Sequence, residues 1–404
     1  MLGVLVLLVV MTIIVEQKYY LPIMLFFLAW SGVMRTSASS YSFYTILQIL
    51  YLILIIFLLL HETHSLNIKR DSIISMLILF PISVIAIVIH GYNFSLGYLT
   101  FMVMLFFVPL YLNQDYGINY KECAKFYVIG VILASFAGLI FLKIPHMSAF
   151  VSLTEHLNNG TSRISGLSGD SNGYAGELLV AVGISLIFLL KTKKIVERIF
   201  CLAGVVICCF FGFMTFSKMF LMLLIVLLAL FIINLIFLSN VRYKGLMIAL
   251  VIISVYIFFS MPQVGNYVQM YQARFMGISD MNQLSSGRSN IWSEYIKYIL
   301  EHVEVLLFGN GFIRTATVNG YAAHNTLIQI LFQCGITGLI GLFIWLNSIK
   351  RKAKTPYLSL FEKVILFIAI FFPWMSLDKL FFDDFFFLIM FYIIAVGQEK
   401  EISN

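Results

Sequence analysis

Residues 219–238 read MFLMLLIVLLALFIINLIFL, twenty residues without a charged side chain. As an α-helix this stretch would be about 30 Å long, which is the thickness of the hydrocarbon core of a bilayer. Its apolar residues are continuous rather than alternating, which favours a helix over a strand of a membrane barrel. A helix within lipid also satisfies its own backbone hydrogen bonds. The stretch therefore predicts a membrane-spanning helix.

Similar apolar runs recur along the whole chain. Of its 404 residues, 61% are hydrophobic and 11% are charged, whereas soluble proteins average about 25% charged residues. We therefore expect an all-α, polytopic integral membrane protein, with residues 1–404 forming a single transmembrane domain of about 12–13 transmembrane helices. The expected spans are 1–15, 20–34, 42–60, 72–90, 94–112, 126–143, 174–190, 199–214, 219–238, 246–261, 325–348, 364–377 and 384–397. Residues 1–15 lack a preceding basic segment and a following cleavage site, so we expect a retained span rather than a signal peptide.

The basic residues predict which loops face the cytoplasm. The net charge is +7, and most lysines lie in short clusters between the apolar runs, as the positive-inside rule describes. This pattern places on the cytoplasmic side the loops 61–71, 113–125, 191–198, 239–245 and 349–363. Parity then places residues 144–173 and the large loop 262–324 outside. No basic face is interleaved with aromatic residues, so we expect no nucleic-acid partner.

Arginine, rather than lysine, dominates the two long outer loops. They hold Arg163, Arg274, Arg288 and Arg314, with Lys297 as their one lysine. Orientation in the membrane requires only charge, whereas the planar guanidinium binds phosphate or carboxylate through two parallel hydrogen bonds. The pattern predicts an anionic ligand at the outer face. The alternative is a set of surface arginines that contact lipid headgroups.

The first outer loop ends in RISGLSGDSNGY, residues 163–174. Its glycines permit close approach of a ligand to the backbone, while Asp170 and Asn172 can form turns or cap the following helix. Glu177 lies about one turn into that helix, where a carboxylate is costly unless paired, so it is a candidate catalytic residue or a salt-bridge partner of Arg163 or Lys218. Lys218 itself, in the short turn Ser217-Lys218, either snorkels to the surface or points into an outer cavity.

The second outer loop contains an amphipathic helix and ends on a histidine. After Ser286-Gly287-Arg288, Ser289 can cap a helix that runs to about His302. Its apolar face has Ile291, Tyr295 and Ile299, and we expect it to lie at the membrane surface with Trp292 and Tyr295 at headgroup depth. The helix breaks at Gly309-Asn310-Gly311. His324 and Asn325 then open the next span, where His324 can act as a general base or simply cap the helix and anchor the loop.

These segments together resemble the O-antigen polymerase and ligase superfamily, which includes the Wzy polysaccharide polymerases. The shared pattern is Arg163 to Asn172, then Ser217-Lys218, Gly287-Arg288, Gly309 with Gly311, and His324-Asn325. The resemblance covers about residues 155 to 345, and the residues before it match only in hydropathy. Lys218 stands where arginine is usual, and Ser171 stands where the family often has proline.

The resemblance implies a GT-C-like glycosyltransferase in the cytoplasmic membrane, with its active site on the extracytoplasmic side. Its donor and acceptor would be undecaprenyl-diphosphate-linked oligosaccharides within membrane lipid, and its further partners would be a chain-length regulator and a flippase. The resemblance implies His324 as catalytic residue, and the position of Glu177 within a span adds it as a second catalytic candidate. The resemblance implies as substrate-binding residues Arg163, Arg288, Lys218, Asp170, Asn172, Gly287, Gly309, Gly311 and Asn325, and the arginine-rich outer loop adds Arg314.

No cofactor or metal is expected, since the sequence contains no Asp-x-Asp, no His/Cys ligand spacing and no Walker loop. Three alternatives to a polymerase remain: a ligase with the same chemistry and another acceptor, a lipid-linked glycan flippase, and a cell-wall glycan polymerase of the RodA type. A flippase would place polar groups at mid-bilayer. The RodA type would have an acidic catalytic residue in the large outer loop, where Asp280 is the only aspartate.

Overall fold

A computed structural model of the chain gives the fold. It describes residues 14–30, 68–90, 96–114, 116–148, 163–238, 262–276, 280–311, 317–350, 353–377 and 385–399, together with isolated positions between them. The predicted spans 1–15, 42–60 and 246–261 lie mostly outside these residues. The described part consists of helices and their connections, with two isolated β-bridges and no strand.

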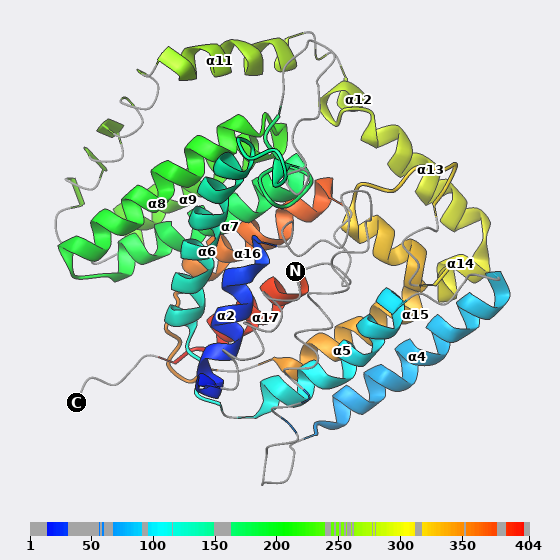
Figure 1. Cartoon of the computed structure of the whole chain (residues 1–404). Helices are drawn as coiled ribbons and strands as arrows, with labels where there is room; N and C mark the ends of the chain where they lie inside the picture. The colour runs from blue at the N-terminus through cyan, green and yellow to red at the C-terminus, as the bar shows by residue number, and fades with distance from the viewer. Residues whose placement is uncertain are drawn as a thin grey trace.

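Figure 1 shows the arrangement of the described helices. Most of those at predicted spans begin within a few residues of the predicted start, whereas one begins six residues early, at Tyr120, and another ends six residues early, at Phe371. Five described helices are long and apolar enough to cross a membrane: α6 (Tyr120–Phe141), α7 (Ser171–Lys191), α8 (Ile195–Met214), α9 (Lys218–Ile233, continued as a π-helix Asn234–Leu238) and α15 (Thr326–Ile349). The other helices at predicted spans are α2 (Tyr20–Leu28), α4 (Arg70–His90), α5 (Leu96–Asn113), α16 (Leu360–Phe371) and α17 (Phe385–Gly397). The structure thus confirms a polytopic all-α membrane protein, while the total of 12–13 spans stays a prediction.

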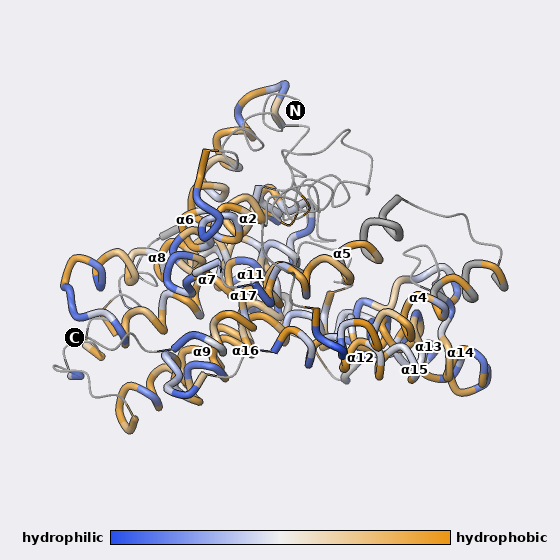
Figure 2. The backbone as a smooth tube through the Cα atoms, turned by 90° about the horizontal axis from the view of Figure 1, so that it is seen from below, coloured by the Kyte–Doolittle hydropathy of each residue, from blue (hydrophilic) through white to orange (hydrophobic). Residues whose placement is uncertain are grey.

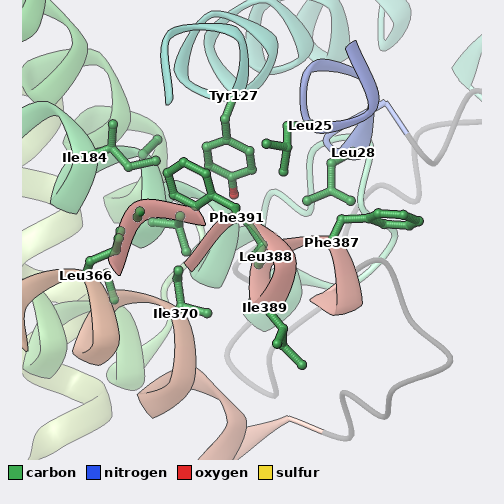
Figure 3. Packing of buried hydrophobic residues seen from close by; sticks show 14 of the residues in the cluster. Leu25, Leu28, Tyr127, Ile184, Leu366, Ile370, Phe387, Leu388, Ile389 and Phe391 are labelled. Carbon is green, nitrogen blue, oxygen red and sulfur yellow. The ribbon is translucent and has the colours of Figure 1, made fainter. Parts of the chain in front are cut away.

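Helix α7 is the central element of the larger helix group. Nearly all of its residues are buried, and it packs against α6, α8, α9 and α16. Helices α2 and α17 extend this group, because their buried side chains pack against those of α6, α7 and α16. Tyr127 and Phe391 lie in this cluster (Figure 3). A second group places α15 against α4 and α5 (Figure 1). Hydrophobic residues predominate along most helices, whereas the helices at residues 262–275 and 288–301 have a mixed composition (Figure 2).

The predicted cytoplasmic loops meet at one end of the helices. Lys191, the last residue of α7, lies 2.9 Å from Glu362 and donates to the backbone carbonyl of Tyr357. The backbone N–H of Tyr120 donates to the side chain of Gln398. At the end of α15, the carbonyl of Ser348 accepts a hydrogen bond from Lys69. Parts of the two loops that parity assigns to the opposite side, residues 163–172 and 284–288, meet at the other end of α7. These described segments therefore lie at opposite ends of α7 from Lys191. Which set faces the cytoplasm stays a prediction.

The large loop 262–324 is itself largely helical. It contains α11 (Pro262–Phe275), α12 (Met281–Leu284), α13 (Arg288–Glu301) and α14 (Val303–Phe308). The N-cap of α13 is Gly287, at φ 86°, so the prediction that Ser289 caps this helix is wrong. The apolar face was predicted correctly, but it packs inward: Tyr295 is fully buried and its hydroxyl donates to the carbonyl of Tyr321. Tyr295 therefore packs within the protein instead of contacting lipid headgroups, while the depth of α13 in the membrane stays a prediction.

Helix α15 is interrupted at Gly335, which has φ 59° and ψ −172°. The interruption leaves the carbonyls of Phe332 and Gln333 to accept hydrogen bonds from the N–H groups of Asn310 and Gly311, each at 2.8 Å. Gly309 fits closely there, because a Cβ on it would lie 2.3 Å from the Gln333 carbonyl oxygen. The Gly-Asn-Gly segment thus satisfies the backbone groups of a broken helix, as a membrane interior requires.

Candidate functional site

A cavity of about 280 Å³ lies at the end of α7 opposite Lys191. It is lined by the side chains or backbone of Arg163, Asn172, Lys218, Met219, Met222, Leu284, Ser285, Ser286, Arg288, Trp292, Met375 and Ser376. Three of these described residues are cations and none is a carboxylate. The cavity therefore combines positive charge with an apolar wall formed largely by methionines and a tryptophan.

Arg163 is buried and held on two sides. Its Nε donates to the carbonyl of Thr215 at 2.8 Å, and its Nη2 donates to Oδ1 of Asn172 at 3.1 Å. The same amide oxygen accepts the hydroxyl of Ser217 at 2.9 Å. The backbone supports this arrangement, because the N–H of Ile164 donates to the carbonyl of Met214. The structure thus joins the Arg163–Asn172 segment to the Ser217-Lys218 turn, although the two are far apart in the sequence.

Lys218 and Arg288 approach the cavity from other elements. The ammonium of Lys218 donates to the carbonyl of Gln283 at 3.1 Å and lies 5.7 Å from the ring centroid of Phe275. Arg288 Nη1 donates to the carbonyl of Ser376 at 2.9 Å. Lys218 lines the same cavity as both arginines, while the position of this cavity on the outer side of the membrane stays a prediction.

Three helices begin at this cavity. Asn172 lies in the first turn of α7, Lys218 is the first residue of α9 and Arg288 is the first residue of α13. A helix N-terminus carries partial positive charge and unsatisfied N–H groups, which favour a bound anion. Asp170 and Ser217 cap α7 and α9 through the N–H groups of Gly173 and Phe220. The cations and the helix ends therefore all favour negative charge in the same space.

Two parts of the lining were absent from the sequence prediction. Helix α16 gives way to a 3₁₀ helix at Phe372–Ser376, and this segment supplies the carbonyl that accepts from Arg288. Its signal in the sequence was Pro373, which cannot donate to the preceding helical turn. Trp292 was predicted at headgroup depth, but it lines the cavity, and its Nε1 donates to the carbonyl of Ala323 at 3.0 Å.

His324 lies directly before α15, as predicted, and is exposed. Its φ of 48° is in the left-handed region, which is uncommon outside glycine. Its two neighbours are fixed: the Ala323 carbonyl binds Trp292, and Asn325 Oδ1 caps α15 by accepting from the N–H groups of Leu327 and Ile328. His324 therefore follows directly after Ala323, whose carbonyl is bonded to the cavity-lining Trp292. His324 itself is not among the described lining residues.

The remaining predicted residues lie around the cavity or away from it. Glu177 is buried farther along α7, where its backbone carbonyl accepts the Tyr127 hydroxyl. Gly287 provides the left-handed start of α13, whereas Gly309 and Gly311 pack against broken α15. Arg314 lies outside the described residues. Within the described part of the chain, no three His, Cys, Asp or Glu side chains are grouped so that they could hold a metal ion.

The fold and this cavity define a polytopic membrane protein with a cationic pocket at one end of its helices. Residues 203–346 match the family model described as O-Antigen ligase. These residues include Ser217-Lys218, Gly287-Arg288, the Gly-Asn-Gly segment and His324-Asn325. This match covers about a third of the chain and supports its relation to the O-antigen ligase and polymerase superfamily. No curated protein and no solved structure gives a match.

Proposed function

We propose that the chain is a polysaccharide polymerase, which joins undecaprenyl-diphosphate-linked oligosaccharide units at the outer face of the cytoplasmic membrane. The observation that carries this proposal is the convergence of Arg163, Lys218 and Arg288 with three helix N-termini in one cavity. A diphosphate carries several negative charges, which such a cavity favours. The apolar wall beside the cations suits the lipid and sugar parts of the same ligand.

The reaction follows from where charge develops. The acceptor sugar hydroxyl attacks the anomeric carbon of the donor, the bond from that carbon to the diphosphate oxygen breaks, and the lipid diphosphate leaves with the electron pair. Arg163 and Arg288 stabilise this departing charge, since fixed cations act most strongly where charge develops in the transition state. Trp292, whose ring position is fixed by its hydrogen bond to Ala323, forms a wall for the sugar next to the diphosphate.

His324 accepts the proton from the attacking hydroxyl in this proposal. Its support is the exposed position at the entrance of α15, next to the residue that binds Trp292. Proton removal by a placed base contributes about 10²–10⁴-fold to a rate. Asn325 serves to cap α15 and so fixes the backbone beside the histidine. Glu177 is the next candidate base if His324 does not take this role.

A ligase is the second candidate, because the matching family model is described as O-Antigen ligase. It would use the same cavity for the same donor but transfer the finished glycan to another acceptor. A polymerase would also work beside a flippase that delivers its substrate and a protein that regulates chain length. The product distribution separates the two candidates, since only a polymerase uses its own product repeatedly as donor.

The test is transfer by the purified protein in lipid nanodiscs with a synthetic lipid-diphosphate oligosaccharide. A polymerase gives a ladder of products, with one lipid diphosphate released for each new linkage, and no divalent metal or nucleotide sugar added. His324→Gln should lower the initial rate at least about a hundredfold, while His146→Gln, the same change at an exposed loop histidine, should have no effect. A folded protein that releases no lipid diphosphate would refute glycosyl transfer, and an unaltered rate in His324→Gln would refute the base assignment.

A further inference from the structure

The connection between α8 and α9 consists of three buried residues, Thr215, Phe216 and Ser217. The outer two both support Arg163. The carbonyl of Thr215 accepts from the Nε of Arg163 at 2.8 Å. The hydroxyl of Ser217 donates to the amide oxygen of Asn172, which also accepts from the Nη2 of Arg163. Phe216 lies between these two supports, so its backbone conformation determines how both of them face the arginine.

Phe216 has a backbone conformation that suits glycine better than phenylalanine. Its φ of 49° is in the left-handed region, where a side chain comes too close to the following carbonyl oxygen. The residue after the C-cap of a helix commonly adopts this conformation, and it is then usually glycine. Phe216 has that place, because Thr215 is the C-cap of α8. Contacts elsewhere in the protein must therefore offset the cost of its backbone.

These contacts come from α11 in the large loop. The buried ring of Phe216 has its centroid 5.6 Å from that of Tyr267 and 5.5 Å from that of Tyr271. The hydroxyl of Tyr271 donates at 3.3 Å to the carbonyl of Phe213, and the same carbonyl accepts the N–H of Phe216 at 3.1 Å. Helix α11 therefore holds the turn through its side chain and through its backbone. A glycine would tolerate the backbone conformation but would lose the ring contact with α11.

Non-glycine residues in the left-handed region gather near the cationic cavity. In the described part of the chain there are four of them: Phe216, Ser286, Asn319 and His324. Ser286 lines the cavity, and His324 is the proposed base. Strained backbone persists only where the surrounding structure fixes it, and it is concentrated at functional sites. The place of Phe216, next to both supports of Arg163, agrees with this tendency.

We propose that Phe216 is a positioning residue of the cationic cavity. Its ring, held by Tyr267 and Tyr271, keeps the Thr215 carbonyl and the Ser217 hydroxyl in place and so orients the guanidinium of Arg163 toward the diphosphate. This role rests on the proposed function, in which Arg163 stabilises the departing diphosphate. Helix α11, of which no described residue lines the cavity, thereby controls the affinity of the cavity. If Phe216 only packed α11 against α8, its removal would lower stability without acting through Arg163.

The test measures the dissociation constant of farnesyl diphosphate, a short polyprenyl diphosphate, for the purified protein in nanodiscs, together with the thermal unfolding midpoint. Phe216→Gly removes the ring while the left-handed backbone stays accessible. We expect the dissociation constant to rise about tenfold, the contribution of one hydrogen bond of a charged group. In an Arg163→Ala background the same change should have almost no further effect. In an Arg288→Ala background the full effect should persist, because only changes that act through a shared partner are strongly non-additive.

A second pair of variants changes α11 alone. Tyr267→Leu removes one ring from the contact with Phe216 and should weaken binding in the same direction, whereas Tyr267→Phe retains the ring and should restore the wild-type affinity. The matched control is Tyr19→Leu. It removes another half-buried tyrosine, whose ring packs against Phe126 near the start of α6 and does not line the cavity. Its binding should equal that of the wild type.

Three results would overturn the role of Phe216. They are wild-type affinity in Phe216→Gly, an equal loss caused by Phe216→Gly in both arginine backgrounds, and equal affinities of Tyr267→Leu and Tyr267→Phe. If Phe216→Gly does not fold, the two Tyr267 variants decide. A wild-type protein that does not bind farnesyl diphosphate would instead remove the proposed function, and the role of Phe216 with it.

Discussion

Replacing Arg163 by lysine tests whether the cavity needs the geometry of arginine or only its charge. The guanidinium uses two different nitrogens, Nε toward Thr215 and Nη2 toward Asn172, at 2.8 and 3.1 Å. A lysine has one nitrogen at the end of a flexible chain, so it can replace at most one of these directions well. One hydrogen bond of a charged group contributes about 1.5–3 kcal/mol, which corresponds to a factor of roughly 10 to 150.

We therefore expect Arg163→Lys to lower the initial rate of lipid-diphosphate release at least about tenfold, close to the effect of Arg163→Ala. The assay uses purified protein in nanodiscs, with the thermal unfolding midpoint recorded for each variant. Arg198→Lys is the matched control, because Arg198 Nε also donates to a backbone carbonyl, at 3.1 Å, but at the other end of α7. It should keep the wild-type rate.

The reasoning would be refuted by one particular pattern of rates. If Arg163→Lys keeps more than half the wild-type rate while Arg163→Ala is inactive and equally stable, only the charge at this position matters. Lys218→Arg extends the test in the other direction. Arginine keeps the positive charge at this position, so under the proposed function the change should preserve activity, and loss of activity would show that the space around Lys218 is specific for lysine.

Three further outcomes follow from other parts of the molecule. Gln283→Cys, at an exposed position, should react with an impermeant maleimide in intact cells that lack the native cysteines; reaction only after the cells are opened would reverse the predicted orientation. Gly309→Ala should lower the unfolding midpoint more than Gly287→Ala, because both glycines have a positive φ but only the first faces backbone, at 2.3 Å; equal effects would contradict the close packing. Asn325→Ala should destabilise the start of α15 by about 1 kcal/mol, since it removes an N-cap, whereas Asn325→Asp should restore most of the unfolding midpoint.

The spans were predictable because the change from apolar to charged residues marks where a helix leaves lipid. The expected span 174–190 corresponds to α7 at Ser171–Lys191, and the small extension reflects the cap by Asp170. The apolar stripe of α13 was also visible, because its spacing follows the helical repeat. What covers that stripe was not visible, since Tyr295 packs against Phe332, which is 37 residues farther along the chain, with ring centroids 5.0 Å apart.

The candidate site was predictable only in part, and for a physical reason. Charged side chains such as Arg163 and Arg288 stand out in an apolar sequence, whereas the groups that fix them are often backbone carbonyls, which every residue carries. Neither Thr215 nor Ser376 has a side chain that marks it as an acceptor for arginine. The start of α13 was misassigned to Ser289 for a similar reason, because a left-handed glycine before the helix replaced a side-chain cap.

The division between arginine and lysine at the two ends of α7 has a structural basis. In the outer cavity, Arg163 and Arg288 each donate to a backbone carbonyl of a neighbouring turn, which fixes the plane of the guanidinium. At the other end, exposed lysines such as Lys193 and Lys194 line a cavity between α6, α7 and α8. A reaction gains from donors that are in place before charge develops, whereas orientation in the membrane requires only charge. The choice of cation at each end of α7 therefore agrees with the proposed function, in which the fixed arginines serve the reaction and the exposed lysines serve orientation in the membrane.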